Sequence, residues 1–217
     1  MTFFAALTVM LLAFRWPVFF SPFQFNPDES TFVSCTLNLH HDPVLYRSTL
    51  GYHLNLYPRM LPGLLGLPQN FLTSRIMALL VVCGSLAAFY HTCRLFASTS
   101  MARLATLAPA TFYALTTKRD FVHFSSEHMP VLILTGSLYF ALRLPEEKRR
   151  ISWVAFGAGV LLGAAPFAKN QVAPFALVVT LFCYAFVLMR DEPWSARLRT
   201  CFWLTLGGMT VPALFVS

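Results

Sequence analysis

The run Val172–Met189, VAPFALVVTLFCYAFVLM, has no charged residue and is long enough to cross the hydrocarbon core of a bilayer as one helix. The whole chain shares this character, because 57% of its 217 residues are hydrophobic and only 12% are charged. A soluble domain has roughly 45–50% apolar and roughly 25% charged residues. The composition therefore predicts a polytopic membrane protein, and it excludes a disordered chain, a collagen-like chain and a disulfide-stapled secreted domain.

Six further apolar segments accompany this run, which makes seven in all. They are Phe3–Phe20, Phe71–His91, Met101–Thr117, Met129–Leu142, Ile151–Ala168 and Cys201–Ser217. We predict an all-α polytopic membrane protein with about seven transmembrane helices in a single domain, residues 1–217. Six spans are the alternative, because the third and fourth segments are short and Pro109 interrupts the third. The first segment is a signal anchor or a cleaved signal peptide, and the absence of a basic N-terminal region and a small-residue cleavage site favours the anchor.

The formal net charge of +7 indicates membrane topology in a chain of this composition. Basic residues are denser in the three short connections at 94–103, 143–150 and 190–199 than on the other side of the predicted membrane. The positive-inside rule then places the N-terminus in the cytoplasm and the long first loop, 21–70, outside it. The basic residues lie at the ends of apolar runs, so we expect no nucleic-acid partner. Only Cys35 of the five cysteines lies outside in this topology, and we expect no disulfide.

The first extracytoplasmic loop opens with the acidic motif Asn26-Pro27-Asp28-Glu29. One interpretation is structural, with Asn26 as a helix cap, Pro27 at the first helical position and Glu29 completing a capping box. The other is functional, because adjacent carboxylates at a membrane surface are costly and usually serve a purpose. Neighbours on a helix point about 100° apart, so Glu29 can cap while Asp28 faces a site. We expect this loop to carry interfacial amphipathic helices, the first of which follows the motif.

Two further connections on the same side contain candidate site residues. Glu127 stands at the mouth of the fourth span, where it either caps that helix or faces a polar cleft. Lys169 lies in the short turn before the sixth span, where it either snorkels to the interface or binds a lipid phosphate.

The order and sidedness of these motifs resemble those of the GT-C superfamily of membrane glycosyltransferases. The shared features are a first span followed at once by Asn-Pro-Asp28-Glu29, a second span that opens with Arg75, an outer Glu127, and the run Gly163-Ala-Ala-Pro-Phe-Ala-Lys169-Asn-Gln. The pattern is most similar to glycosyltransferase family 39, which includes dolichyl-phosphate-mannose protein mannosyltransferases and bacterial aminoarabinose and lipopolysaccharide-core relatives. The resemblance covers the whole chain, and each motif alone is short.

The resemblance implies an activity and a role for each matching residue. Such enzymes move a sugar from a polyprenyl-phosphate donor to a glycan, lipid or protein acceptor outside the cytoplasm, usually with inversion. The catalytic set would be Asp28 as general base, Glu29 as organiser of the loop, and Glu127 as the second acid, with Asp120 as its alternative. Lys169 would offset the charge on the departing lipid phosphate. The expected location is a bacterial inner membrane, with the endoplasmic reticulum as the alternative.

Chemistry of this kind needs a base, cations near the phosphate and a positioned acceptor, but no nucleotide site and no cofactor. The chain accordingly has no phosphate-binding glycine loop. A divalent metal held by His40, His41, Asp42 and His53 is an alternative that we do not favour, because their spacing matches no zinc pattern.

The chain has fewer predicted spans than members of this family, so we expect an N-terminal portion of such an enzyme or an inactive form. A transporter, or a non-catalytic assembly subunit that handles lipid-linked substrates, is the competing hypothesis. Transporters place ionisable residues near the bilayer midplane and show internal repeats. Here the acids lie at the outer ends of the spans and no repeat occurs, which favours the transferase.

Small residues recur every four positions at Ala155, Gly159 and Gly163 in the fifth segment. A stripe of this kind lets two membrane helices approach closely. Gly207-Gly208 in the last segment is expected to serve packing as well.

The predicted topology can be tested with thiol labelling in intact cells. A membrane-impermeant maleimide should label Cys35 and leave Cys93 and Cys201 unlabelled until the membrane is opened, because only Cys35 lies on the outer side. Labelling of Cys201 from outside would reverse the orientation.

Overall fold

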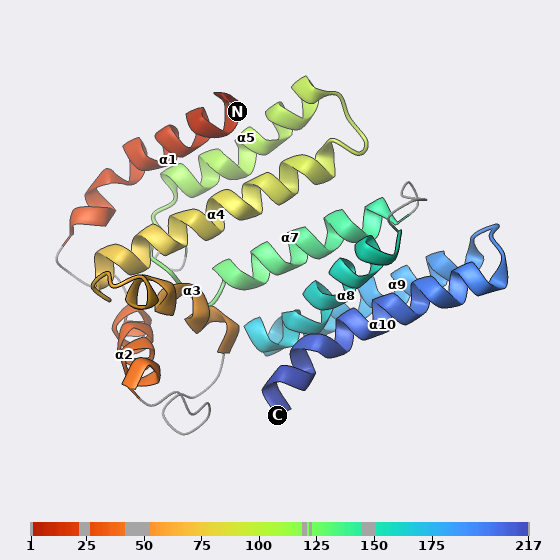
Figure 1. The fold of residues 1–217 in the computed structure, drawn as a ribbon. Helices are drawn as coiled ribbons and strands as arrows, with labels where there is room; N and C mark the ends of the chain where they lie inside the picture. Colours follow the sequence, from red (N-terminus) through yellow and green to blue (C-terminus); the bar gives the residue numbers. More distant parts are fainter. Residues whose placement is uncertain are drawn as a thin grey trace.

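The computed structural model describes residues 2–21, 27–41, 53–118, 121, 123–144 and 151–216. These residues form α-helices joined by short turns, without a β-strand among them (Figure 1). The elements are α1 (Thr2–Phe20), α2 (Pro27–His41), α3 (His53–Leu64), α4 (Phe71–Cys93), α5 (Thr99–Leu115), α7 (His128–Arg143), α8 (Ile151–Ala168), the 3-10 turn η1 (Asn170–Val172), α9 (Ala173–Met189) and α10 (Trp194–Val216).

Each of the seven predicted apolar segments forms a helix in the described part of the chain. The bounds of α8 are those that the sequence indicates, whereas α10 begins at Trp194, seven residues before the predicted Cys201. The difference arises because apolarity marks only the part of a helix that suits a bilayer. Residues such as Arg197 are good helix formers, and they extend the helix beyond its apolar part.

Four helical segments are long enough and apolar enough to cross a membrane: α1, α4, α8 and the stretch Asn170–Met189 that contains α9. Membrane character is thus supported by these four. The helices α5 and α7 have 17 and 16 residues, which is short for a span, and α10 carries Arg197 and Arg199 in its first two turns. Seven crossings therefore stay a prediction.

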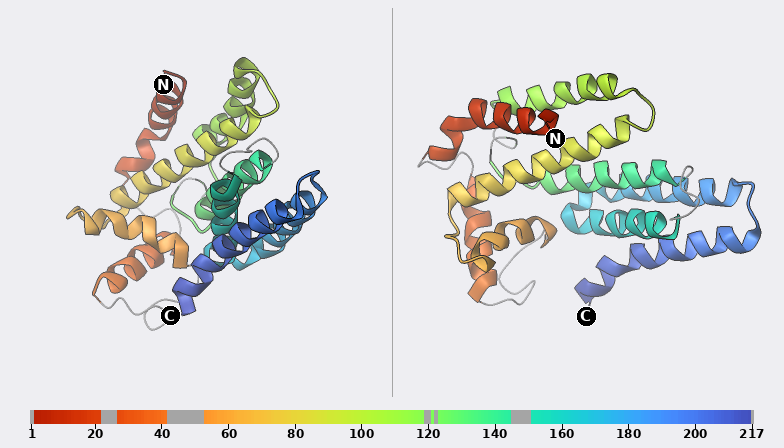
Figure 2. Two further views of the ribbon diagram at one scale, coloured as in Figure 1. Left: turned by 45° about the vertical axis from the view of Figure 1, so that its right-hand side comes forward. Right: turned by 45° about the horizontal axis from the view of Figure 1, so that its top comes forward.

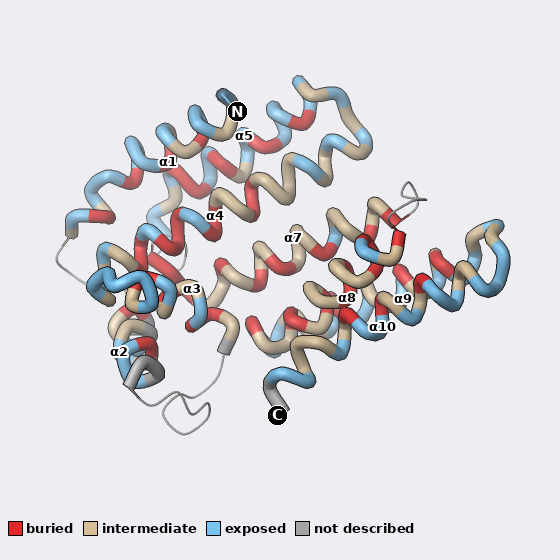
Figure 3. Tube along the Cα trace, in the orientation of Figure 1, coloured by how far each residue is buried: buried red, intermediate tan, exposed pale blue. Residues whose placement is uncertain are grey.

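The helices lie side by side, with α4, α7 and α8 in the middle of the molecule (Figure 1). One hydrophobic core joins α1, α4 and α5, and another joins α7, α8, α9 and α10. Contacts between α4 and α7 connect the two cores. Buried positions accordingly follow the facing sides of the central helices, whereas α1 and α9 expose much of their apolar surface (Figure 3). Such outward apolar faces are compatible with a lipid bilayer.

The helices α2 and α3 stand across one end of the other helices (Figure 2). At this α2–α3 end, α1, α5 and α8 finish while α4, α7 and α9 begin (Figure 1). The helix α2 begins at Pro27, the position that the sequence predicts, because proline suits the first turn of a helix. The sequence does not predict α3, because Pro58 and Pro62 lie inside it and proline usually interrupts a helix.

The backbones of α8 and α10 touch through glycine, which confirms the close packing predicted from the small-residue stripe. A Cβ atom added to Gly159 would collide with the carbonyl oxygen of Leu204, and one added to Gly163 would collide with that of Gly208. The approach is reciprocal, because a Cβ on Gly207 would collide with the carbonyl of Phe156. Absence of side chains is therefore what lets these two helices pack.

We predict that Gly159→Ala lowers the free energy of unfolding by about 1–3 kcal/mol, because the added methyl group forces two backbones apart. The matched control is Gly84→Ala on α4, where the new methyl group meets only the flexible end of Leu132 at 3.3 Å. Unfolding of both variants in mixed micelles measures the difference. Equal stability of the two variants would contradict the close contact.

Candidate functional site

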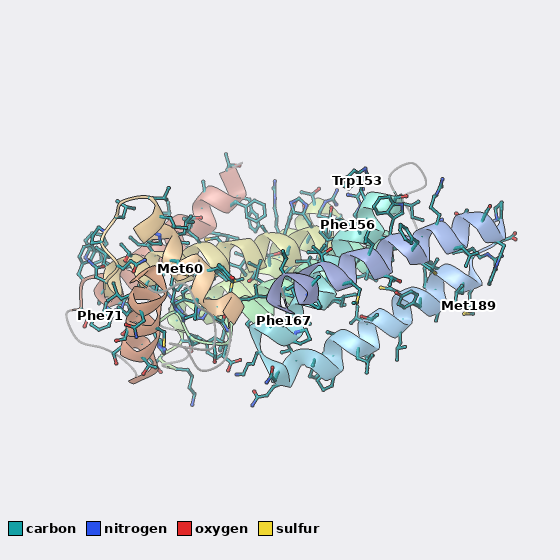
Figure 4. The ribbon with its side chains drawn as sticks, turned by 60° about the horizontal axis from the view of Figure 1, so that its bottom comes forward. Met60, Phe71, Trp153, Phe156, Phe167 and Met189 are labelled. Carbon is teal, nitrogen blue, oxygen red and sulfur yellow. The ribbon has the colours of Figure 1, made fainter. Side chains whose placement is uncertain are left out.

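The described candidate residues gather at the α2–α3 end, although they come from separate connections. Glu29 lies in α2, Glu127 directly precedes α7, and Lys169 directly follows α8. Figure 4 shows Met60 of α3 and Phe71 of α4 at this end, with Trp153 and Met189 at the opposite end.

Several predicted residues fall outside the described part. The backbone of Asp28 belongs to the first turn of α2, but its side chain is not among the described ones, and Asp120 is outside altogether. The same holds for the suggested metal ligands, that is, for Asp42 and for the side chains of His40, His41 and His53. Among the residues that are described, no three His, Cys, Asp or Glu side chains gather to form a metal site.

Glu29 forms a bidentate ion pair with Arg75 of α4. The guanidinium Nε and Nη2 atoms donate to the two carboxylate oxygens at 2.7 and 3.0 Å, and both side chains are 1% exposed. Fork-shaped pairing of this kind fixes geometry as well as charge. The predicted capping partner of Glu29, Asn26, lies outside the described residues. The structure pairs Glu29 with Arg75 of α4 instead.

Arg75 also binds the end of α1. Its Nη1 atom donates to the carbonyl oxygens of Val18 and Ser21, each at 2.7 Å. A local cap sets where α4 begins and thus where Arg75 points, because Asn70 and Thr73 exchange capping-box hydrogen bonds of 3.0 Å. One buried guanidinium therefore connects α1, α2 and α4.

The ends of α5 and α8 are bound in a similar way. Arg15 of α1 donates from Nε to the carbonyl of Tyr113 in α5 at 2.6 Å, and it also binds the carbonyl of Phe121. Asn55 of α3 donates to the carbonyl of Ala168, the last residue of α8, at 2.7 Å. The last carbonyls of a helix have no partner within it and carry its negative dipole end, so cationic and amide donors are well matched to them.

Arg59 joins α3 to the turn before α7. Its guanidinium lies 4.1 Å from the ring centre of Phe124 and donates to the carbonyl of that residue and to that of Asn55. Burial lowers the pKa of Arg59 to about 9, while nearby Cys35 and Glu29 act in the opposite direction. The side chain remains cationic at neutral pH, so α3 contributes a buried positive charge to this end of the molecule.

Glu127 and Lys169 form an ion pair between the turns before α7 and after α8. Glu127 occupies the N-cap position of α7, and its side chain makes no capping hydrogen bond to that helix. Lys169 is 9% exposed, and its ammonium group binds the Glu127 carboxylate. A lysine that snorkels would instead extend its ammonium group into water. The Glu127 side chain itself is 38% exposed.

The side chains of Asn55 and Ser125 hold the turns that carry this pair. The Asn55 amide that binds Ala168 also reaches the carbonyl of Ser126 at 3.5 Å, so it contacts the residue directly before each member of the pair. The Ser125 hydroxyl accepts the backbone N–H of Glu127 at 3.1 Å and contacts His128 Nδ1 at 3.2 Å. Sequence reasoning missed Asn55 and Ser125, whose only signal was their polarity beside apolar neighbours.

Two cavities lie near these residues. One of about 10 Å³, the space of about one water molecule, lies between α2, α3 and α4 and is lined by Arg59, Thr36 and Ser74 among others. The other is apolar, has about 300 Å³ and lies between α8, α9 and α10. Its lining includes Pro166 and Ala173, which stand on either side of the turn that carries Lys169.

Comparison with known proteins gives no relatives: no protein-family model matches the chain, and neither does any curated protein or solved structure.

We predict that Glu29→Gln lowers the free energy of unfolding by about 3–5 kcal/mol, because it removes the carboxylate charge that pairs with the buried Arg75 guanidinium. The matched control is Glu192→Gln, which removes the partner of Arg190 from a more exposed ion pair at the opposite end. That change should cost less than about 1 kcal/mol. Thermal and denaturant unfolding of the purified variants measure both values, and similar losses would contradict the structural role of Glu29.

Proposed function

We propose that this protein is a membrane glycosyltransferase of the GT-C type, resembling glycosyltransferase family 39. In this proposal it moves a sugar from a polyprenyl-phosphate donor to an extracytoplasmic hydroxyl of a glycan, lipid or protein, with inversion at the anomeric carbon. One observation carries the proposal. Glu29, Glu127 and Lys169, which come from three separate connections, lie at one end of the helices, and Glu127 contacts Lys169.

The proposed membrane topology has seven crossings with the N-terminus in the cytoplasm of a bacterial cell. It is supported by seven helices that follow the predicted segments and by four that meet the length and apolarity of a span. The α2–α3 end then faces outward. The proposal thus puts the candidate acids at the outer water boundary, where an acceptor hydroxyl is available.

Asp28 is the proposed general base, which removes the proton of the acceptor hydroxyl as that oxygen attacks the sugar. Support comes from its neighbour, since the buried pair between Glu29 and Arg75 anchors the first turn of α2. The anchoring role of Glu29 and the proposed catalytic role of Asp28 thus fall on two neighbouring helical positions, which are about 100° apart. Glu29 is thereby a positioning residue in the proposed site.

Lys169 is proposed to offset charge on the leaving lipid phosphate, with Glu127 as the second acid. The low exposure of Lys169 supports this role, because a cation acts more strongly on an anion where water is scarce. The apolar cavity beside its turn offers space for part of a lipid chain. A phosphate leaving group requires no resident cofactor in this scheme.

Lys169 and Glu127 bind each other in this structure, and this ion pair supports a second candidate, a non-catalytic assembly subunit that handles lipid-linked substrates. An ion pair of this kind holds two turns together whether or not a reaction occurs. Measured sugar transfer separates the two candidates.

We predict that Asp28→Asn lowers sugar transfer by roughly 10²-fold or more, because asparagine keeps the size of the side chain but cannot take up the proton. The assay uses the full-length protein with a series of polyprenyl-phosphate sugars and follows loss of the lipid-linked sugar. Asp191→Asn makes the same change in an exposed turn at the opposite end and should leave transfer unchanged.

Protein level and thermal midpoint are recorded for both variants. Full transfer by Asp28→Asn, or a loss of transfer proportional to a loss of stability, would make Asp28 a structural residue. No transfer by the unmodified protein would favour the assembly subunit.

A further inference from the structure

The ion pair between Glu127 and Lys169 presents a difficulty for the proposed function, on which the following inference rests. A lysine that is to meet a phosphate already has an anionic partner within the chain. We propose that Glu127 is a built-in competitor at Lys169, which an incoming phosphate ester displaces, so that arrival of the donor releases the Glu127 carboxylate.

The two partners differ in how firmly they are held. Lys169 has a side chain that is 11% exposed, in a turn that continues directly from α8. The end of α8 is held by Asn55, through its bond to Ala168. Glu127 has a side chain that is 38% exposed and makes no capping bond to α7. The Glu127 carboxylate is therefore the partner with the greater access to water, and it is the one that can turn away from the pair.

Exchange of one anion for another at Lys169 keeps the buried ammonium paired throughout. A lysine ammonium is a compact charge with three donors, and it binds carboxylate and phosphate oxygens alike. The sugar-linked donor is a phosphodiester with one negative charge, the same as Glu127, and the polyprenyl phosphate that remains after transfer is a monoester with up to two. The exchange thus keeps a counter-charge at the ammonium group when the donor binds.

The released carboxylate has a defined position. The backbone N–H of Glu127 is held by Ser125, so the side chain turns about a fixed point at the α2–α3 end. Glu127 is consequently available to a second substrate only after Lys169 has received its anion. This coupling gives an order of events, donor first and acceptor second, without a moving domain.

The test measures binding of a phosphate ester by the full chain in nanodiscs of phosphatidylcholine, which carries no net charge. The probe is farnesyl phosphate, a short polyprenyl phosphate that has no sugar, and inorganic phosphate serves as a second probe. We expect Glu127→Gln to bind farnesyl phosphate about tenfold more tightly than the unmodified protein, a change of about 1.4 kcal/mol. Glutamine keeps a hydrogen-bond acceptor for Lys169 and removes only the competing charge.

Two further variants make the result specific to this pair. Lys169→Met should weaken binding, and Glu127→Gln combined with Lys169→Met should bind no better than Lys169→Met alone. Glu192→Gln is the matched control, because Glu192 is also a partly exposed acid in an ion pair, with Arg190 at the opposite end. It should leave the affinity unchanged, and thermal midpoints without ligand check that each variant is folded.

The outcomes separate this inference from the proposed function. Equal affinity of the unmodified protein and Glu127→Gln, with binding still lost in Lys169→Met, would overturn the competition and leave the phosphate role of Lys169 in place. Absence of farnesyl phosphate binding in every variant would overturn both. Inorganic phosphate that binds the unmodified protein and Glu127→Gln as tightly as farnesyl phosphate does would assign the site to a free phosphate and overturn the lipid-linked donor as its ligand.

Discussion

The α2–α3 end depends on one constraint, that helices whose ends are buried within the protein must find donors for their last carbonyl groups. Arg75 meets this need for α1 and at the same time neutralises Glu29, which ties α2 to the same place. Arg15 does so for α5, and Asn55 does so for α8. The polar side chains of this end therefore have a structural role, which is to bind the carbonyl groups at the helix ends. These hydrogen bonds also fix the position of any reactive group nearby.

Apolar runs and spacing predict much of the fold. A long apolar run specifies a helix almost by itself, because a backbone in apolar surroundings must bond internally, and the seven segments accordingly become helices. The contact of α8 with α10 was also predictable, since Gly159 and Gly163 repeat at helical spacing. The position of α3 was not predictable, because its two proline residues are typical of a helix end. Tertiary contacts made by Asn55 and Arg59, which the sequence does not show, hold this helix in place.

The candidate site was predictable as a set of residues but not as a set of contacts. Lys169 and Glu127 are 42 residues apart, and Glu29 and Arg75 are 46 apart. No local pattern identifies such pairs, so the sequence alone left capping, snorkelling and catalysis open. Partner identity decides among them: Glu29 points inward to a buried guanidinium, whereas Glu127 remains partly in water. The same residue type thus serves as an anchor at one position and as an adjustable group at the other.

The glycine contact between α8 and α10 bears on the order in which the chain is assembled during synthesis. The partner of Gly159 and Gly163 is separated from them by the whole of α9, so the ribosome completes α9 before α10 can dock. During that interval the groove on α8 has no backbone to fill it. Docking of α10 against Gly159 and Gly163 is therefore the step that completes the packing of this half of the molecule.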